Sequence, residues 1–321
     1  MPWWRTHSPN ARYIDMWMFP GMHPTNVDLL QRLKSADDRQ FTTNMDVVGT
    51  VSEYDADKRG WIESYQVGLR TDIWTPDQQE QQDTVRKLQQ LRKQELREEI
   101  KSSGRLNSTE SALLEHRLQD DAVMSLKPGD VETRRLVLKH FRSTGTRIRW
   151  VGSLEELTSW ELANSLAAKN PLLSLSVNLS EIDLFTVIQQ HHQRFRYPAT
   201  YGFCFLDEST RRVLNITIKR KWVSVGADFT IEADGKRVGV IDGNLIGFGY
   251  NAYLDVHEPQ LAQNRRLMEV LSLFVTSVGY HKALWKGLRK RLQSIRLGNW
   301  QLSQIDSNEL QLLQAPRRRS A

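Results

Sequence analysis

The chain has 321 residues, enough for one large domain or two ordinary domains with a substantial hydrophobic core. A net charge of +6 and a pI of about 9.4 favour an anionic partner, but the excess is too mild to identify one. A single cysteine, Cys204, excludes an intrachain disulfide and is typical of a reducing compartment or the mitochondrial matrix. No apolar run reaches the roughly 20 residues of a membrane-spanning helix. We therefore expect an intracellular protein without such a helix, with a mitochondrial location as one option.

The first 25 residues combine large aromatic side chains with arginines and four prolines. The prolines interrupt any continuous helix, and the apolar core of a secretory signal is missing. Side chains such as Trp3, Trp4, Trp17 and Phe19 are costly to expose to water. The segment is therefore predicted to be an extended arm that packs on the body of the protein or on a partner.

Residues 40–75 are predicted to form a β-hairpin, because valines and aromatic residues flank the charged segment Asp55–Gly60. The segment also fits the first half of an EF-hand calcium loop. Arg59, however, stands where an oxygen ligand belongs, and Gln66 replaces the bidentate glutamate. We predict a charged hairpin turn that does not bind calcium.

The segment 76–128 is polar and helical in character. Its apolar stripe is thin, since Val85, Leu88, Leu91 and Leu96 stand among glutamines, lysines, arginines and glutamates. Such a stripe is typical of solvated helices or of an arm that lies across a neighbour. The repeat lasts too few heptads to support a coiled coil.

Between residues 130 and 192 the local signals alternate between helix and strand. They predict a helix from Asp130 to Phe141, a strand over Arg147–Val151, a helix over Leu154–Lys169 that begins with a capping box at Ser153 and Glu156, and a helix from Ser180 over Ile188. His191 and His192 follow. Adjacent histidines do not readily ligate one metal ion, and no cysteine or acid stands nearby at ligand spacing, so a surface position is expected.

The stretch from Phe203 to Val256 is rich in strand signals. Apolar residues alternate with period two in several runs separated by turn signals, which predicts short antiparallel strands. Asp234-Gly235 is the sharpest hairpin signal, because both central residues of a type I′ turn need positive φ, and Asp242-Gly243 repeats it. The next segment, Leu267–Trp285, is mostly uncharged, and its longest uncharged run, Val270–Tyr280, is about half the length needed to span a bilayer, which predicts a buried helix.

This order of elements resembles the second half of a Tubby C-terminal-like barrel and is closest to phospholipid scramblases and LURP-one-related proteins. The resemblance is carried by the strand Val223–Ile231, the turn Asp234-Gly235, the strand Val238–Ile241, the segment Phe248–Val256 and the helix Leu267–Trp285. It implies a closed antiparallel barrel around one hydrophobic helix, with the first half of the barrel supplied by residues 40–75, by 146–179 or by both. Asp255 is the only acid where scramblases have an acidic calcium segment, so calcium-activated scrambling is not implied.

The chain turns basic along this helix, with no acidic residue from Val270 to Ile305. Leucines and an isoleucine recur at helical spacing opposite a set of cations, which are Lys282, Lys286, Arg289, Lys290, Arg291 and Arg296. A basic amphipathic helix suits an anionic membrane or a nucleic-acid backbone, so these six residues are the predicted anion- or lipid-binding site. The alternative is a solvated face beside the mouth of the barrel.

We predict an α+β protein with four parts: an aromatic arm and hairpin (1–75), a polar helical segment (76–128), the Tubby-like or scramblase-like domain (130–300) and a basic tail (301–321). No grouping of residues indicates catalysis, a cofactor or a metal, which favours a non-enzymatic protein. Two functions stay open. One is association with an anionic phospholipid membrane. The other is a structural subunit of a large assembly, such as a mitochondrial ribosome, a respiratory complex or an ATP synthase, in which a partner covers the aromatic arm.

Overall fold

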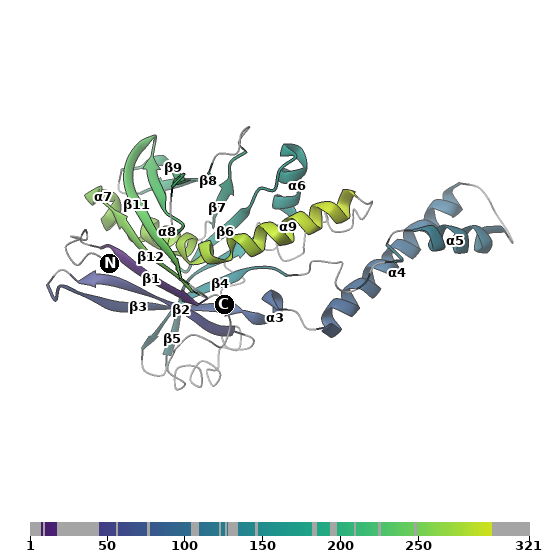
Figure 1. Ribbon diagram of the computed structural model, residues 1–321, viewed down its shortest axis with the longest axis horizontal. Helices are drawn as coiled ribbons and strands as arrows, with labels where there is room; N and C mark the ends of the chain where they lie inside the picture. Colours follow the sequence, from purple (N-terminus) through teal and green to yellow (C-terminus); the bar gives the residue numbers. More distant parts are fainter. Residues whose placement is uncertain are drawn as a thin grey trace.

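A closed β-barrel with a helix in its interior dominates the computed structural model, and a pair of helices projects from its side (Figure 1). The residues that the structure describes are 8, 10–17, 45–55, 57–75, 78–103, 109–121, 123–125, 127, 134–144, 147–181, 185–192, 198–208, 210–223, 226–246 and 249–296. The predicted α+β class and antiparallel barrel are confirmed.

Twelve strands form the barrel, and each pair of neighbours is antiparallel. The strands follow one another in chain order from β2 to β12, and β1 closes the barrel by pairing with β12 on one side and β2 on the other. They are β1 (Arg12–Trp17), β2 (Met45–Asp55), β3 (Gly60–Arg70), β4 (Val137–Thr144), β5 (Arg147–Glu156), β6 (Ser174–Leu179), β7 (Phe185–Gln190), β8 (Thr200–Asp207), β9 (Arg212–Arg220), β10 (Phe229–Ala233), β11 (Lys236–Ile246) and β12 (Gly249–Val256).

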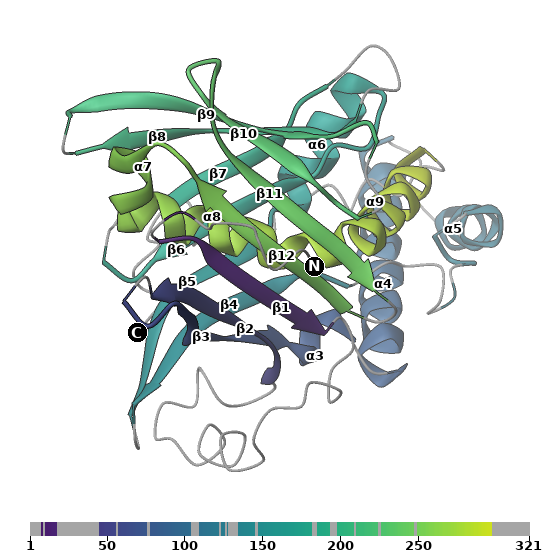
Figure 2. The same cartoon turned by 60° about the vertical axis from the view of Figure 1, so that its left-hand side comes forward.

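Helix α8 (Arg265–Ser277) lies inside the barrel (Figure 2). Asn264 caps its start by accepting a hydrogen bond from the N–H of Leu267 at 3.2 Å. Leu271, Phe274 and Val275 are inaccessible to solvent, which confirms the predicted burial of this helix. The helix contacts β1, β4, β5, β6 and β12, so strands from both halves of the chain enclose it.

The chain leaves the barrel through a short 3₁₀ turn, η2 (Val278–Tyr280), and continues as α9 (His281–Arg296). Helix α9 packs against α6 (Thr158–Ala168). Two further helices are short: α3 (Thr71–Trp74) follows β3, and α7 (Pro259–Gln263) precedes α8. No helix among the described residues is long and apolar enough to cross a membrane.

Helices α4 (Gln78–Ser102) and α5 (Thr109–Asp120) form a helical arm that extends away from the barrel (Figure 1). Arg92 of α4 holds Asp121, just beyond α5, at 2.9 Å, and Val85, Leu88 and Val123 form a small apolar cluster. The predicted polar helices with a thin stripe are confirmed, although Leu91 of that stripe is 40 % exposed.

The barrel crosses the domain boundaries expected from the sequence. Segments 45–70 and 147–179 both supply strands, and β1, β4 and β7 complete the first half. The segments 1–75 and 130–300 therefore contribute to one barrel instead of forming separate parts. Arg12–Trp17, expected as a piece of an extended arm, is a barrel strand, whereas Trp3, Trp4, Phe19 and the tail 301–321 lie outside the described residues.

Three local predictions in the middle of the chain need correction. The helix predicted from Asp130 to Phe141 is wrong over residues 137–141, which lie in β4, and residues 185–190, also predicted as a helix, form β7. Ser153 and Glu156 lie in β5, and α6 begins only at Thr158. Each segment pairs with strands on both sides, and this tertiary pairing outweighs the local helix signals.

Two of the predicted turns are confirmed, and the one predicted at Asp242-Gly243 is wrong. Asp234 and Gly235 have φ values of 48° and 80°, as a type I′ turn requires. Asp55 ends β2 and accepts hydrogen bonds from the N–H groups of Asp57 and Lys58 at 3.0 and 3.1 Å. Gly243, in contrast, lies within β11, where a Cβ atom would stand 2.5 Å from the carbonyl oxygen of Ala227. The glycine is required there by a close approach of two backbones, not by a turn.

Candidate functional site

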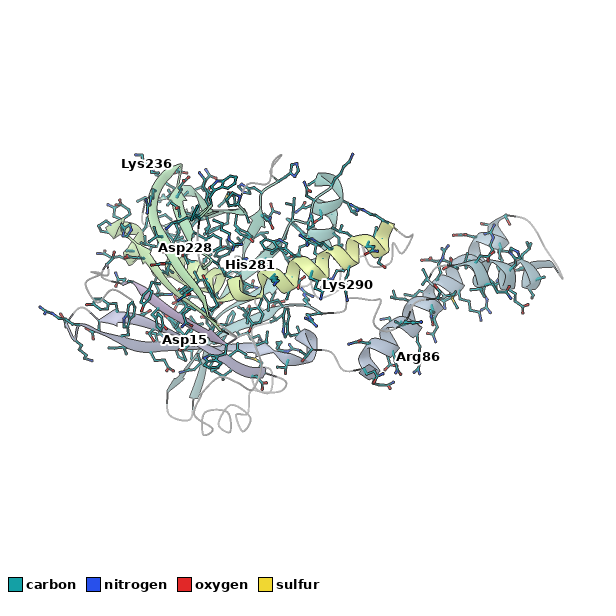
Figure 3. The ribbon with its side chains drawn as sticks, viewed as in Figure 1. Asp15, Arg86, Asp228, Lys236, His281 and Lys290 are labelled. Atoms are coloured by element: carbon teal, nitrogen blue, oxygen red, sulfur yellow. The ribbon has the colours of Figure 1, made fainter. Side chains whose placement is uncertain are left out.

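The exposed face of α9 carries five of the six cations predicted to bind an anion. Successive residues of a helix are rotated by about 100°, so these five side chains fall within an arc of about 120°. The exposed cations are Lys282, Lys286, Arg289, Lys290 and Arg296. His281 stands at the start of this helix and Lys290 farther along it (Figure 3). The sequence prediction of a basic amphipathic helix is confirmed as structure, and we call this arc the α9 basic face.

Arg291 does not belong to this face. It lies on the opposite side of α9, 5 % exposed, where Nη1 is 2.6 Å from Glu156 Oε1 and 3.8 Å from Glu161 Oε2. Its Nη2 donates to the carbonyl oxygen of Arg134. Burial, and secondly the neighbouring Glu156, raise the pKa of Glu161 well above its ordinary value. One guanidinium thus lies between two acidic side chains, and the group fastens α9 to β5 and α6.

Four of the five cations on the α9 basic face are not paired with an acid in the described part of the chain. Among the described residues, Lys282, Lys286, Arg289 and Arg296 form no ion pair. Lys219, by comparison, holds Glu232 at 2.6 Å. Positive potential is therefore concentrated along one side of one helix.

A cavity of about 380 Å³ opens beside the first turn of α9. Its walls come from the ends of β8, β9 and β10 and from the junction of α8 with α9, and the lining residues are Ala199, Tyr201, Arg220, Ala227, Phe229, Val278, Gly279, His281, Lys282 and Trp285. The cavity thus adjoins the α9 basic face at Lys282. We call it the α9 cavity.

The sequence interpretation missed the connection between β9 and β10, which borders the same cavity. Residues 223–231 were expected to be a strand, but β10 begins at Phe229. Trp222 and Val223 are 70 % and 92 % exposed. Arg220 and Lys221 precede them directly. The sequence did contain a signal for this loop, because a basic run is followed by an aromatic and an aliphatic residue between two strands. This pattern is typical of a loop that enters the interface between water and a membrane.

A second group of polar side chains lies inside the barrel, around Glu269 of α8. Arg12 of β1 approaches Glu269 to 3.2 Å and donates a hydrogen bond of 2.9 Å to Ser272. The hydroxyl of Tyr65 donates to Glu269, and the buried ring of His140 stacks on Tyr65 with centroids 6.0 Å apart. We call Arg12, Tyr65, His140 and Glu269 the lumen cluster.

The charges of the lumen cluster follow from its burial. Burial opposes ionisation of Glu269, but Arg12 and the surrounding donors outweigh it and lower the pKa of Glu269 to about 2. Burial raises the pKa of Tyr65 to about 12 and lowers that of His140, so both stay neutral. The small space next to Glu269 measures about 10 Å³, which holds one water at most. The lumen cluster therefore ties β1, β3 and β4 to the central helix.

No group of three or more histidine, cysteine or acidic side chains within the described ranges could hold a metal ion. His191 and His192 are exposed at the end of β7, as expected. In the Asp55–Gly60 turn, the carboxylate of Asp55 is already engaged by two N–H groups and lies 3.7 Å from Lys58 Nζ. Comparisons with protein-family models, with curated proteins and with solved structures found no match for this chain.

Proposed function

We propose that the protein is a non-enzymatic, Tubby-like or scramblase-like barrel that associates with anionic phospholipid membranes through the α9 basic face. The observation that carries this proposal is the set of five exposed cations on one arc of a helix with no acid. Cations near an anionic surface contribute about 1 kcal/mol each to binding. Five of them on one face suffice for reversible attachment without a membrane-spanning segment.

The β9–β10 loop supports an orientation in which the α9 basic face points toward the membrane. Trp222 and Val223 are exposed next to Lys221. Arg220 and Ala227, at the two ends of this loop, line the same cavity as the first turn of α9. An exposed tryptophan beside cations is typical of side chains that enter the headgroup region. Loop and helix would then contact the membrane together, with the open end of the α9 cavity toward it.

The barrel adds a further argument. A closed antiparallel barrel around a buried helix near the end of the chain is the arrangement that the resemblance to Tubby-like and scramblase-like proteins implies. The polar groups of the lumen cluster engage one another, and the described residues contain no metal-ligand group, which supports a binding role over an enzymatic one.

Co-sedimentation with vesicles of phosphatidylserine and phosphatidylcholine tests the proposal. Replacing Lys286, Arg289 and Lys290 with glutamine should weaken binding by at most about 3 kcal/mol at low salt. Screening reduces this figure as the salt concentration rises. Pure phosphatidylcholine vesicles should not retain the wild type.

A matched control removes three exposed cations from the helical arm, namely Lys87, Lys93 and Arg97. With glutamine at these three positions, this variant has the same net charge as the α9 variant. A general charge effect would therefore weaken the vesicle binding of both variants equally. Equal binding of the wild type and the α9 variant would contradict the proposal.

A second candidate function is a structural subunit of a large, for instance mitochondrial, assembly. The helical arm favours it, because α4 and α5 project from the barrel and Leu91 stays 40 % exposed in a lone chain (Figure 1). Light scattering of the purified protein with and without residues 78–120 tests this alternative. Loss of a defined larger assembly on removal of the arm would support it, and a monomer in both cases together with vesicle binding would favour the first function.

A further inference from the structure

The α9 cavity has walls whose neutral polar groups are already engaged. The indole N–H of Trp285 donates to Gln190 Oε1 at 2.9 Å. The Tyr201 hydroxyl lies 3.1 Å from His281 Nδ1, and Ser277 Oγ lies 3.0 Å from His281 Nε2. What these groups present to the cavity is therefore ring surface and not hydrogen-bonding capacity.

The hydrogen bonds also fix the charge of His281. Ser277 donates its only hydroxyl proton to the carbonyl oxygen of Phe274 at 2.7 Å, so its Oγ accepts from His281 Nε2. Nδ1 then accepts the proton of the Tyr201 hydroxyl. Burial, and secondly the charge of Arg220, lower the pKa of His281 to about 3, in agreement with a neutral ring. The histidine therefore contributes no charge to the cavity.

Two cations remain at the cavity, Arg220 on β9 and Lys282 on α9. No carboxylate is among the lining residues. Within the part of the chain that the structure describes, neither side chain forms a hydrogen bond or an ion pair. Arg220 is half-buried, so its guanidinium is only partly hydrated and gains more from an anionic partner than a fully exposed cation would.

The other walls are apolar. Phe229 is 1 % exposed, and Ala199, Ala227 and Val278 line the same space, with the ring of Trp285 at its side. A volume of about 380 Å³ lies within the range of about 300–1,000 Å³ that is typical of small-molecule sites. An occupant therefore needs apolar surface for most of its length and hydrogen-bond acceptors at one end.

We propose that the α9 cavity binds a single-chain anionic amphiphile, with its carboxylate or phosphate head between Arg220 and Lys282 and its apolar chain against Phe229, Val278 and Trp285. Arginine matches both kinds of head, because its planar fork donates two parallel hydrogen bonds. The site would bind a free fatty acid in solution or a monoacyl phospholipid at a membrane. It goes beyond the proposed attachment to membranes, because it needs no bilayer.

Calorimetric titration of the full chain with four short probes tests the inference in the absence of vesicles. The probes are octanoate, octyl phosphate, 1-octanol and acetate, which separate the contributions of head and tail. Octanoate or octyl phosphate should bind one per chain and at least tenfold more tightly than 1-octanol or acetate. Shortening octanoate to hexanoate should weaken binding roughly tenfold, since two buried methylenes are lost.

Two variants locate the site. Replacing Arg220 and Lys282 together with glutamine should weaken octanoate binding at least tenfold. The control replaces Lys236 and Lys93 with glutamine; both are exposed, lie outside the α9 basic face and do not line the cavity, so octanoate affinity should change less than about twofold. Ala199→Phe should also abolish binding, because the new ring would fill the cavity from a partly exposed position.

Equal affinity for octanoate and 1-octanol would overturn the inference. An equal loss of octanoate affinity in the two double variants would overturn it too. Absence of binding by all four probes would overturn it as well. These titrations are independent of the vesicle experiment, whose variant keeps both Arg220 and Lys282. A protein that binds octanoate but no vesicles would refute the proposed function alone, and the reverse result would refute only the cavity site.

Discussion

Replacing Glu269 with glutamine should destabilise the protein by about 3 kcal/mol at neutral pH. The variant keeps the shape of the side chain but leaves Arg12 buried beside a neutral amide. Removing one partner of a buried ion pair costs about 3–5 kcal/mol. The lower end applies here, because Arg12 retains Glu53 at 3.1 Å, a carboxylate whose side chain is 39 % exposed.

The pKa of Glu269 leads to a similar figure. It lies at about 2 instead of 4.5, and about 1.4 kcal/mol per pKa unit corresponds to about 3 kcal/mol. Because the folded-state pKa is depressed, this stabilisation is fully present above pH 4.5 and is lost as the pH falls toward 2. The difference in unfolding free energy between wild type and Glu269→Gln should therefore be constant near neutral pH and narrow below pH 4.5.

Urea denaturation followed by tryptophan fluorescence measures these differences. Glu53→Gln is the matched control, because it removes a partly exposed partner of the same arginine and should cost less than about 1 kcal/mol. Arg12→Met combined with Glu269→Met should recover most of the stability, since it removes both buried charges. A Glu269→Gln variant as stable as the wild type would refute the reasoning, and so would a double variant whose loss equals the sum of the single losses.

Phe274→Asp should abolish soluble folding, because Phe274 is fully enclosed and packs on the rings of Tyr201, Phe229 and His281, which are neutral and do not pair with a new carboxylate. A soluble variant with a cooperative melting transition would contradict the position of α8 inside the barrel. Arg291→Ala should lower the unfolding free energy by about 3 kcal/mol or more, whereas Arg289→Ala two residues away should change it by less than about 0.5 kcal/mol. Equal urea midpoints for these two variants would show that the Arg291–Glu156 pair does not fasten α9. Calorimetry should detect no micromolar calcium affinity in the Asp55–Gly60 turn, and such an affinity that vanished in Asp55→Ala would overturn the hairpin interpretation.

The parts of the fold that were predicted correctly depend on signals local in the sequence. Asp234-Gly235 specifies its own turn, and the uncharged run from Val270 to Tyr280 requires burial wherever it lies. Strand β1 was missed because its inward positions include Arg12. An arginine on the core face does not match an apolar alternation, and its partner Glu269 stands on a helix more than 250 residues later. Only the assembled barrel explains why a cation faces inward there.

The candidate site also has one part that the sequence predicts, the α9 basic face, and one part that it does not, the α9 cavity. The arrangement of the cations around α9 could be predicted from their spacing in the sequence. The same spacing excludes Arg291 from the α9 basic face, because Arg291 comes nine residues after Lys282 and therefore lies about 180° around the helix. That step was not taken from the sequence. The α9 cavity, in contrast, joins Arg220, Phe229 and Lys282 from three separate elements. No spacing along the chain brings them together, so the sequence alone could not reveal it.

Competition between anionic vesicles and single-stranded RNA tests the proposed membrane association most directly. Both partners carry phosphates, so general attraction to negative charge would not distinguish them. Because Trp222 and Val223 are exposed and suited to the headgroup region, the wild type should prefer phosphatidylserine-containing vesicles at each salt concentration from about 50 to 300 mM. Replacing Lys286, Arg289 and Lys290 with glutamine should remove most of that binding. Preference of the wild type for RNA, or retention of vesicle binding by the variant, would contradict the account.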